Sequence, residues 1–331
     1  MMTAMSNQPT SRFCHRCGTR AQQHADFCMA CGERLIKVSS PLNAPKNSSS
    51  AGKVFLAFAK CLGYYGFFLL SQLIVALIYS FVIAISSAVR DPASYTVESV
   101  TADYMSHIHE IGIISGLITL AGYFIFFKLI KKSLVRELSV KPISITSSGA
   151  MVVFGFSAQI IIGLFLTFFY YFFSLNADHS NEAVEMLFET GNVWIQFLNV
   201  AFLTGIVEEV VFRGLIYRTL KGVMPTSLAV FLSAVIFGIA HMNPEQFFYT
   251  TLLGVLLALA YERKGSLIAP ILIHMSFNGS NFVLSNLSFK SGMPYVALLF
   301  LSIGAFLIAM GFVFFTDKEP KDRLIIIKDK A

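Results

Sequence analysis

Long apolar blocks separated by short polar segments make up most of the chain. Between residues 54 and 315 most blocks are about 16 to 25 residues long, without the period-2 or period-3.6 stripes of a water-facing surface. Helices of this length suit a lipid bilayer. The pattern predicts an all-α polytopic membrane protein with about eight transmembrane helices, over residues 54–88, 111–130, 150–174, 192–215, 226–241, 246–261, 266–287 and 293–315.

The remaining segments are polar and divide the chain into domains. Residues 1–36 carry a cysteine-rich unit, and residues 37–53 combine two Pro with five Ser, as a solvated linker does. We assign residues 54–315 to the membrane domain and residues 316–331 to a charged cytoplasmic tail. No apolar stretch precedes residue 54, so we expect the first membrane helix, and no cleavable signal peptide, to target the protein.

Composition and charge support a membrane location. The 331 residues are 55% hydrophobic and 13% charged, against about 25% charged in soluble domains, which argues against a soluble enzyme. The net charge of +6 does not imply nucleic-acid binding, because in a membrane protein the position of Lys and Arg matters more than their sum. With a cytoplasmic N-terminus, only Arg90 and Lys290 among 25 basic residues fall in outer loops. We therefore expect a multi-pass protein of the cell membrane with both termini cytoplasmic.

Four of the five cysteines form two near-copies of the hexamer F-C-x-x-C-G, fourteen positions apart. Two such turns can hold one metal ion between four thiolates, and a segment this short has no core to fold without it. The alternative is a redox C-x-x-C, but that motif normally occurs singly on a thioredoxin-like frame. We predict a small N-terminal zinc ribbon with a closed, structural zinc site made by Cys14, Cys17, Cys28 and Cys31.

Three charged residues lie within the apolar span at residues 192–215. Glu209 and Arg213 are four positions apart with the acid first, which favours an ion pair on a helix. Glu208 points about 100° away from Glu209 and has no local partner. Ionisable groups inside a membrane are functional by default because they are costly to insert. We expect Glu208 to be the working carboxylate.

Two histidines occur in or at the edge of apolar spans. His241 ends one span, and His274 lies in another with Asn278 one turn beyond it on the same face. Asn278 can orient the imidazole or donate a hydrogen bond to a reacting oxygen. We place the other five histidines in soluble segments and give them no role: His15, His24, His107, His109 and His179.

These groups suit peptide hydrolysis. Glu208 can take a proton from water that His241 and His274 position, directly or through a metal ion. Glu, His and His also match a three-ligand catalytic zinc site with one open position, so metal-dependent and metal-free versions both stay open. A proton or ion site of a transporter uses the same residue types. On the acids and histidines alone, hydrolase and transporter are equally favoured.

The motifs themselves add a resemblance. E-E-x-x-x-R, F-x-x-x-H and H-x-x-x-N follow one another in the sequence, with Phe237 opening the second motif. Over residues 150–290 the chain resembles the CPBP family of intramembrane proteases, also called the CAAX amino-terminal protease or Abi family. The resemblance implies an eight-helix core and the catalytic set Glu208, Glu209, Arg213, His241, His274 and Asn278, in a family described as both metalloproteases and glutamate proteases.

The resemblance also implies partners and roles. It points to a membrane-associated peptide or protein substrate; bacterial members are linked to bacteriocin self-immunity, peptide maturation and signalling, and eukaryotic members trim three residues after a prenylated Cys. The ribbon lies outside the family core and can bind a partner protein, which leaves an inactive scaffold as a third hypothesis. Because the fifth and sixth spans have only 16 residues each, we expect them to form a hairpin within the membrane that brings His241 toward Glu208.

Overall fold

The chain divides into two units, Met1–Ser48 and Ser49–Ala331. A computed structural model describes residues 12–13, 20–21, 50–90, 96–173, 192–285 and 293–316. In the first unit, strand β1 (Arg12–Phe13) pairs antiparallel with β2 (Arg20–Ala21). The zinc ribbon stays a prediction, because its four ligands lie outside the described residues: Cys14, Cys17, Cys28 and Cys31.

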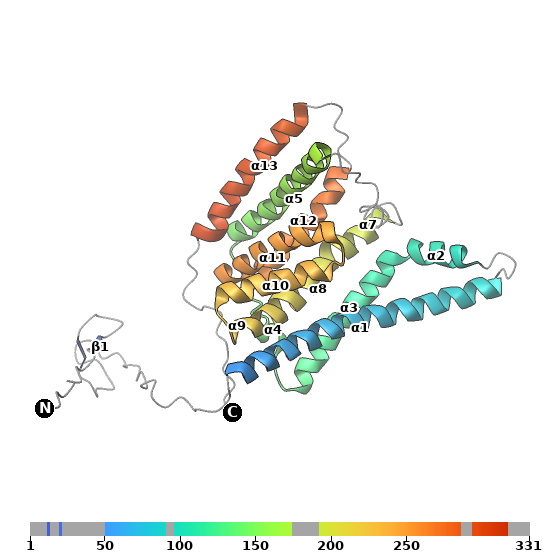
Figure 1. Ribbon diagram of the computed structural model, residues 1–331, viewed down its shortest axis with the longest axis horizontal. Helices are drawn as coiled ribbons and strands as arrows, with labels where there is room; N and C mark the ends of the chain where they lie inside the picture. Colours follow the sequence, from blue (N-terminus) through green and yellow to red (C-terminus); the bar gives the residue numbers. More distant parts are fainter. Residues whose placement is uncertain are drawn as a thin grey trace. The chain divides into compact units, whose positions relative to one another are not determined.

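All regular secondary structure in the described residues of the second unit is helical (Figure 1). A helix lies at each of the eight positions where the sequence predicts a span, and two short helices, α2 (Val97–Ser106) and α4 (Leu134–Glu137), were not predicted. The elements are α1 (Ser50–Arg90), α2 (Val97–Ser106), α3 (Ile108–Leu129), α4 (Leu134–Glu137), α5 (Ile145–Phe173), α7 (Val193–Gln196), η3 (Phe197–Leu203), α8 (Thr204–Glu209), η4 (Val210–Tyr217), α9 (Arg218–Lys221), α10 (Thr226–Ala240), α11 (Pro244–Lys264), α12 (Ile268–Ser285), α13 (Met293–Gly311) and η5 (Phe312–Thr316).

Five helical segments of the described chain are long and apolar enough to cross a membrane, fewer than the predicted eight. α10 has only 15 residues, and α11 and α12 carry too many polar side chains. The five segments indicate a multi-pass membrane protein. They are Ala51–Arg90, Ile108–Leu129, Ile145–Leu166, Val193–Lys221 and Ala297–Phe314.

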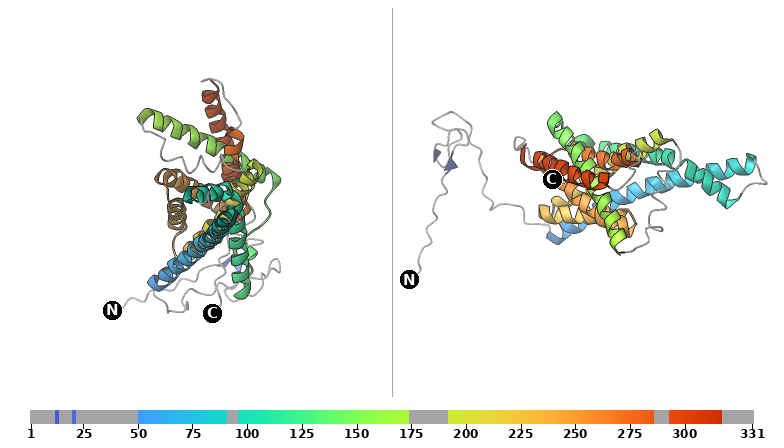
Figure 2. Two further views of the ribbon diagram at one scale, coloured as in Figure 1. Left: turned by 90° about the vertical axis from the view of Figure 1, so that its right-hand side faces the viewer. Right: turned by 90° about the horizontal axis from the view of Figure 1, so that it is seen from above.

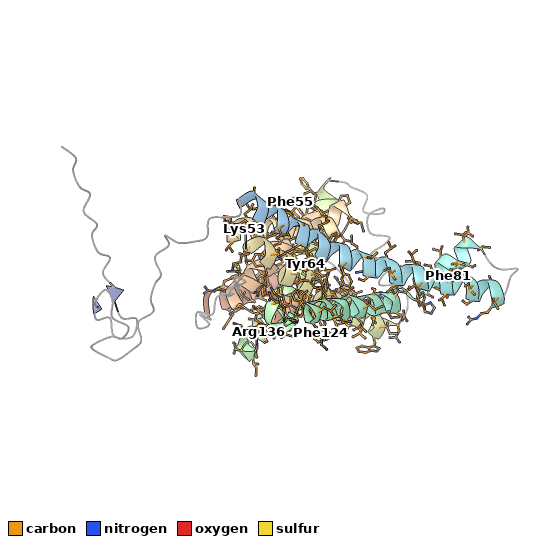
Figure 3. All side chains as sticks on the ribbon, turned by 90° about the horizontal axis from the view of Figure 1, so that it is seen from below. Lys53, Phe55, Tyr64, Phe81, Phe124 and Arg136 are labelled. Atoms are coloured by element: carbon orange, nitrogen blue, oxygen red, sulfur yellow. The ribbon has the colours of Figure 1, made fainter. Side chains whose placement is uncertain are left out.

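Helix α1 is unbroken over 41 residues and already includes residues 50–53, which the sequence pattern assigned to the linker. Its length is about 60 Å, roughly twice the thickness of the hydrocarbon core of a bilayer. Phe55 and Phe81 project from α1, and Phe124 projects from the neighbouring α3 (Figure 3). Large apolar side chains exposed in this way suit a surface in contact with lipid.

The helix that carries the carboxylates runs through the middle of the second unit. It is one continuous segment, Val193–Lys221, made of α7, η3, α8, η4 and α9. Its η3–η4 part contacts α1 and α3 on one side and α10, α11 and α12 on the other. Figures 1 and 2 show α5, α12 and α13 gathered on one side and α1, α2 and α3 on the other. Every side chain of η4 is buried, so charged groups here are shielded from solvent.

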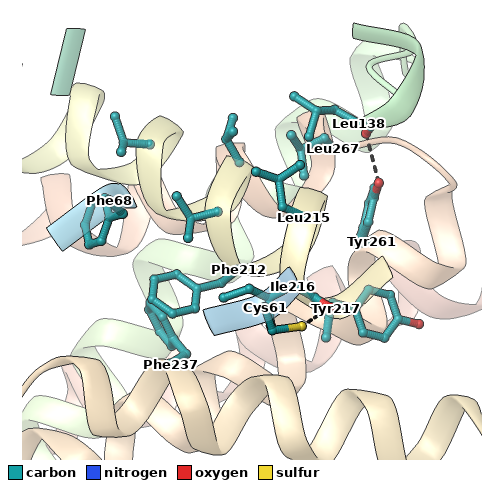
Figure 4. Packing of buried hydrophobic residues seen from close by; sticks show 14 of the residues in the cluster. Cys61, Phe68, Leu138, Phe212, Leu215, Ile216, Tyr217, Phe237, Tyr261 and Leu267 are labelled. Atoms are coloured by element: carbon teal, nitrogen blue, oxygen red, sulfur yellow. Dashed lines mark hydrogen bonds between the residues drawn. The ribbon is translucent and has the colours of Figure 1, made fainter. Parts of the chain in front are cut away.

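An aromatic core anchors this central helix (Figure 4). Phe212 packs edge-on against Phe237 of α10, with ring centroids 5.0 Å apart, and also touches Tyr65 and Phe68 of α1. Such ring pairs add about 0.5–1.5 kcal/mol each beyond burial of their area. The core therefore holds α10, and the histidine at its end, against the helix that carries the carboxylates.

Close glycine contacts set the spacing of the helices around the site. A Cβ atom on Gly155 of α5 would lie 2.1 Å from the Ile273 carbonyl oxygen of α12, and one on Gly238 of α10 would lie 2.1 Å from Thr251 Oγ1 of α11. No other residue allows such an approach, because only glycine lacks the Cβ atom. α5–α12 and α10–α11 are also the most extensive helix pairs of the described chain.

Candidate active site

Two adjacent carboxylates lie at the C-terminal end of α8, a six-residue α-helical segment between the π-helical segments η3 and η4. π-helical turns are rare and are often found at functional sites. The Glu209 side chain is fully buried, whereas the Glu208 side chain keeps 17% of its surface exposed. The two carboxylates therefore differ in their access to water or substrate.

Glu209 binds two partners through one oxygen. Arg213 Nη1 donates to Glu209 Oε1 over 2.6 Å, which is the ion pair expected from their spacing. His274 Nδ1, from α12, lies 2.8 Å from the same oxygen. All three side chains are at least 96% buried, so a carboxylate here has to be compensated by hydrogen bonds and positive charge. The contact with His274 was not predicted from the sequence.

His274 faces the second carboxylate with its other nitrogen. A carboxylate oxygen only accepts, so Nδ1 donates its hydrogen to Glu209, and in a neutral imidazole Nε2 is then the nitrogen that accepts. His274 Nε2 lies 3.6 Å from Glu208 Oε2. That separation is too long for a direct hydrogen bond and leaves two acceptors facing one small region. One imidazole thus links the buried carboxylate to the accessible one.

Phe237 of α10 joins the remaining groups. The Arg213 guanidinium carbon lies 4.2 Å from the Phe237 ring centroid, a cation–π contact. The rings of His241 and His274 both pack edge-on against Phe237, with centroids 4.8 and 5.8 Å away. His241 Nδ1 also pairs with the Phe237 carbonyl oxygen at 2.8 Å, which ends α10 and leaves Nε2 of His241 available.

Asn278 makes a contact with the backbone of η3 instead of orienting the imidazole of His274, which was one of its two expected roles. Its Nδ2 donates to the Val200 carbonyl oxygen of η3 over 3.1 Å, and Glu209 rather than Asn278 holds the Nδ1 atom of His274. Asn278 therefore links α12 to η3 with one of its two N–H groups. Its second N–H group keeps the capacity to donate to a reacting oxygen.

The donor types suit a catalytic zinc ion, but their arrangement does so only in part. Glu208 and His274 face each other, and His274 has a carboxylate on its far nitrogen, as metal-binding histidines commonly do. The contacts of the His241 ring given above are with Phe237. Over the described ranges, no group of three His, Cys, Asp or Glu side chains is close enough to hold a metal ion.

One histidine lies where the sequence reading did not expect it. His109 was assigned to a soluble segment, but it is 1% exposed in the first turn of α3, which begins three residues before the predicted span. Its Nδ1 lies 3.4 Å from Asn199 Nδ2 of η3. A hydropathy pattern misses such a residue because polar side chains at the start of a helix lower the local average.

Comparison with known proteins places a family match on this region. Residues 190–280 match the family described as Type II CAAX prenyl endopeptidase Rce1-like. That stretch contains the central helix, α10, α11 and most of α12. It includes Phe237 and all six residues of the expected catalytic set.

A human protein gives a second match. CAAX prenyl protease 2 of Homo sapiens is 30% identical over an alignment of 139 residues, and the match covers 35% of this chain. The match covers 41% of the human protein, less than half its length. No solved structure matches the chain. The part of the chain that carries the carboxylates, the histidines and Asn278 is therefore similar to the Rce1-like CAAX prenyl endopeptidases.

Proposed function

We propose that the protein is an intramembrane endopeptidase that hydrolyses peptide bonds of membrane-associated peptides or proteins. The observation that carries the proposal is the chain of contacts from Glu209 through His274 to Glu208, in which only the last carboxylate is accessible. The family match at residues 190–280 supports the same reaction class. In an apolar span such an arrangement is costly, which argues for a catalytic role.

Glu208 acts as the general base. A water molecule between Glu208 Oε2 and His274 Nε2 can donate one hydrogen to each acceptor. Glu208 takes a proton from this water while the oxygen of the water attacks the carbonyl carbon of the peptide bond. The C–N bond then breaks, and the proton passes from Glu208 to the leaving amine, which yields one carboxylate and one amine terminus.

The other residues position the reactants. Glu209 fixes the ring orientation of His274, and Arg213 offsets the charge of Glu209. The free N–H group of Asn278 donates to the oxyanion that forms on the attacked carbonyl group. His241 helps to position the water through its Nε2 atom, because its Nδ1 atom is paired with a backbone carbonyl oxygen of α10.

A catalytic metal stays part of the proposal as one of two versions. In the metal version, Glu208, His241 and His274 would hold a zinc or other divalent ion, which lowers the pKa of bound water and polarises the substrate carbonyl. In the glutamate version, the same residues act on water alone. The proton transfer given above for Glu208 belongs to the glutamate version, because a carboxylate that binds a metal ion is a poor general base. The roles of Glu209, Arg213 and Asn278 are the same in both versions.

The family name and the sequence support proposals about the topology, the ribbon and the substrates. We propose eight membrane spans with both termini in the cytoplasm, and a structural zinc ribbon that binds a partner or substrate protein. The human relative is named a CAAX prenyl protease, so peptides with a lipidated cysteine are one substrate class to test. Peptides that take part in bacteriocin self-immunity or in peptide maturation are another. The bilayer itself is the constant partner.

Comparison of cells with wild-type protein and with Glu208→Gln tests the proposal. Gln keeps the shape of the side chain but cannot take a proton. We expect membrane and secreted peptides with new termini only in cells with the wild-type protein, at equal abundance of the two proteins. Identical peptide sets in both cells would contradict an endopeptidase.

A further inference from the structure

Two amide side chains meet between α5 and α12, away from the groups of the catalytic site. Gln159 Nε2 of α5 donates to Asn281 Oδ1 of α12 over 2.7 Å. Gln159 lies within the apolar span Ile145–Leu166, where unpaired amides are unfavourable. The mechanism proposed above uses neither residue.

The amide pair lies on the same line as the catalytic residues of α12. His274, Asn278 and Asn281 follow the spacing i, i+4, i+7, which places them on one face of a helix. On one side of this face α12 meets α8 and η3, through the contacts of His274 and Asn278, and on the other side it meets α5. Asn281 therefore continues the polar face from the site toward the C-terminal end of α12.

The pair keeps hydrogen-bonding capacity after its own contact is made. One N–H of Gln159 and one acceptor site of Asn281 are used, which leaves Gln159 Oε1 and both N–H groups of Asn281 Nδ2. Both residues are only partly buried, as a site that receives a substrate has to be. An acceptor and a donor from one amide pair can complement the N–H and C=O groups of a single residue in an extended chain, because these two groups point to the same side of the strand.

We propose that Gln159 and Asn281 bind the main chain of an extended substrate about three residues from the cleaved bond. This inference rests on the proposed endopeptidase function. Seven residues of helix separate His274 from Asn281, a rise of about 10 Å, and an extended chain advances about 3.3 Å per residue. The substrate's N–H donates to Gln159 Oε1 and its C=O accepts from Asn281 Nδ2, so recognition here reads the backbone and tolerates different side chains.

Backbone-ester peptides test the contact directly. The parent probe is the fastest-cleaved member of a library of membrane-anchored peptides in liposomes. It is made again as a series in which one peptide bond is replaced by an ester. The ester stands at the second, third or fifth position from the cleaved bond, on either side. An ester at the third position lacks the N–H group that Gln159 would accept. We expect the wild-type protein to lose about three- to tenfold in kcat/KM on one third-position ester, mainly through KM, and little on the others.

Variants separate substrate binding from helix packing. Gln159→Leu should lose about the same factor on the all-amide peptide and show no further loss on the third-position ester. Asn281→Leu gives a second variant, and Val153→Ala, on the exposed face of α5, is the matched control with full ester discrimination.

If the amide pair were purely structural, Gln159→Leu and Asn281→Leu would lower thermal stability and slow the cleavage of all peptides equally, and ester discrimination would stay intact. That result would overturn the inference. If the wild-type protein cleaves the all-amide peptide but treats every ester alike, the inference fails while the endopeptidase stands. If the wild-type protein cleaves no peptide of the library, the proposed function fails, and the inference fails as well because it depends on that function.

Discussion

His274 Nδ1 and Arg213 Nη1 share one oxygen of Glu209, at 2.8 and 2.6 Å. The spacing of Glu209 and Arg213 in the sequence shows only the ion pair, whereas the fold adds an imidazole from a helix 65 residues further along the chain. The second carboxylate of the motif is therefore a buried support for the histidine that faces the first. The two adjacent glutamates should respond differently to the same substitution.

Glu209→Gln should destabilise the protein more than Glu208→Gln. It leaves the Arg213 charge uncompensated in a fully buried site, and breaking a buried pair costs about 3 to 5 kcal/mol. Glu208→Gln removes a partly exposed carboxylate and should fold normally without cleaving. Membrane abundance and thermal unfolding in detergent measure the difference. Wild-type stability of Glu209→Gln would count against the assigned pairing.

Phe237→Leu should reduce cleavage at least tenfold while the protein still folds. Leu fills part of the volume but loses the aromatic contacts with Arg213, His241 and His274. The matched control is Phe231→Leu on the same helix, whose side chain is 56% exposed and should tolerate the change. Equal activity of the two variants would show that the ring has no part in positioning the histidines.

Gly155→Ala should lower both stability and activity. Its new Cβ atom would overlap the Ile273 carbonyl oxygen and push α12 away from α5. This shift would displace His274, which follows Ile273 in the chain. Gly149→Ala on the same helix is the control, because nothing lies within 4 Å of its new Cβ atom and Ala is the better helix former. Thermal unfolding and peptide cleavage of the two variants should diverge; similar behaviour would contradict the close approach of α5 and α12.

Purified protein should contain about one zinc ion per chain, bound by the four thiolates of the predicted ribbon. Elemental analysis measures the zinc content. The double variant Cys14→Ser, Cys17→Ser should lose this zinc. An unchanged metal content in the double variant would rule out the four-cysteine site.

The sequence predicts much of this fold because long apolar blocks leave helices as the main choice, and a helix lies at each predicted position. It also picks out Glu208, Glu209 and His274 as candidate site residues, since ionisable groups stand out against an apolar background. Contacts between distant segments are harder to predict. The Glu209–His274 bond depends on how α12 crosses α8, and the burial of His109 depends on a helix that begins before its apolar stretch. Neither follows from local spacing.

The central claim is that Glu208 and its histidines hydrolyse peptide bonds, and a transporter would use the same residues for a different reaction. The decisive measurement reconstitutes the protein in liposomes with a library of short membrane-anchored peptides, while a pH-sensitive dye reports proton flux and mass spectrometry detects new termini. Groups that act as one unit are non-additive, so changing Glu208, His241 or His274 alone should abolish nearly all cleavage, and double changes should cost little more. Cleavage without flux, lost in Glu208→Gln, is the predicted result. Flux that vanishes in Glu208→Gln, with no peptide cleaved by the wild-type protein, would contradict the protease and favour a transporter.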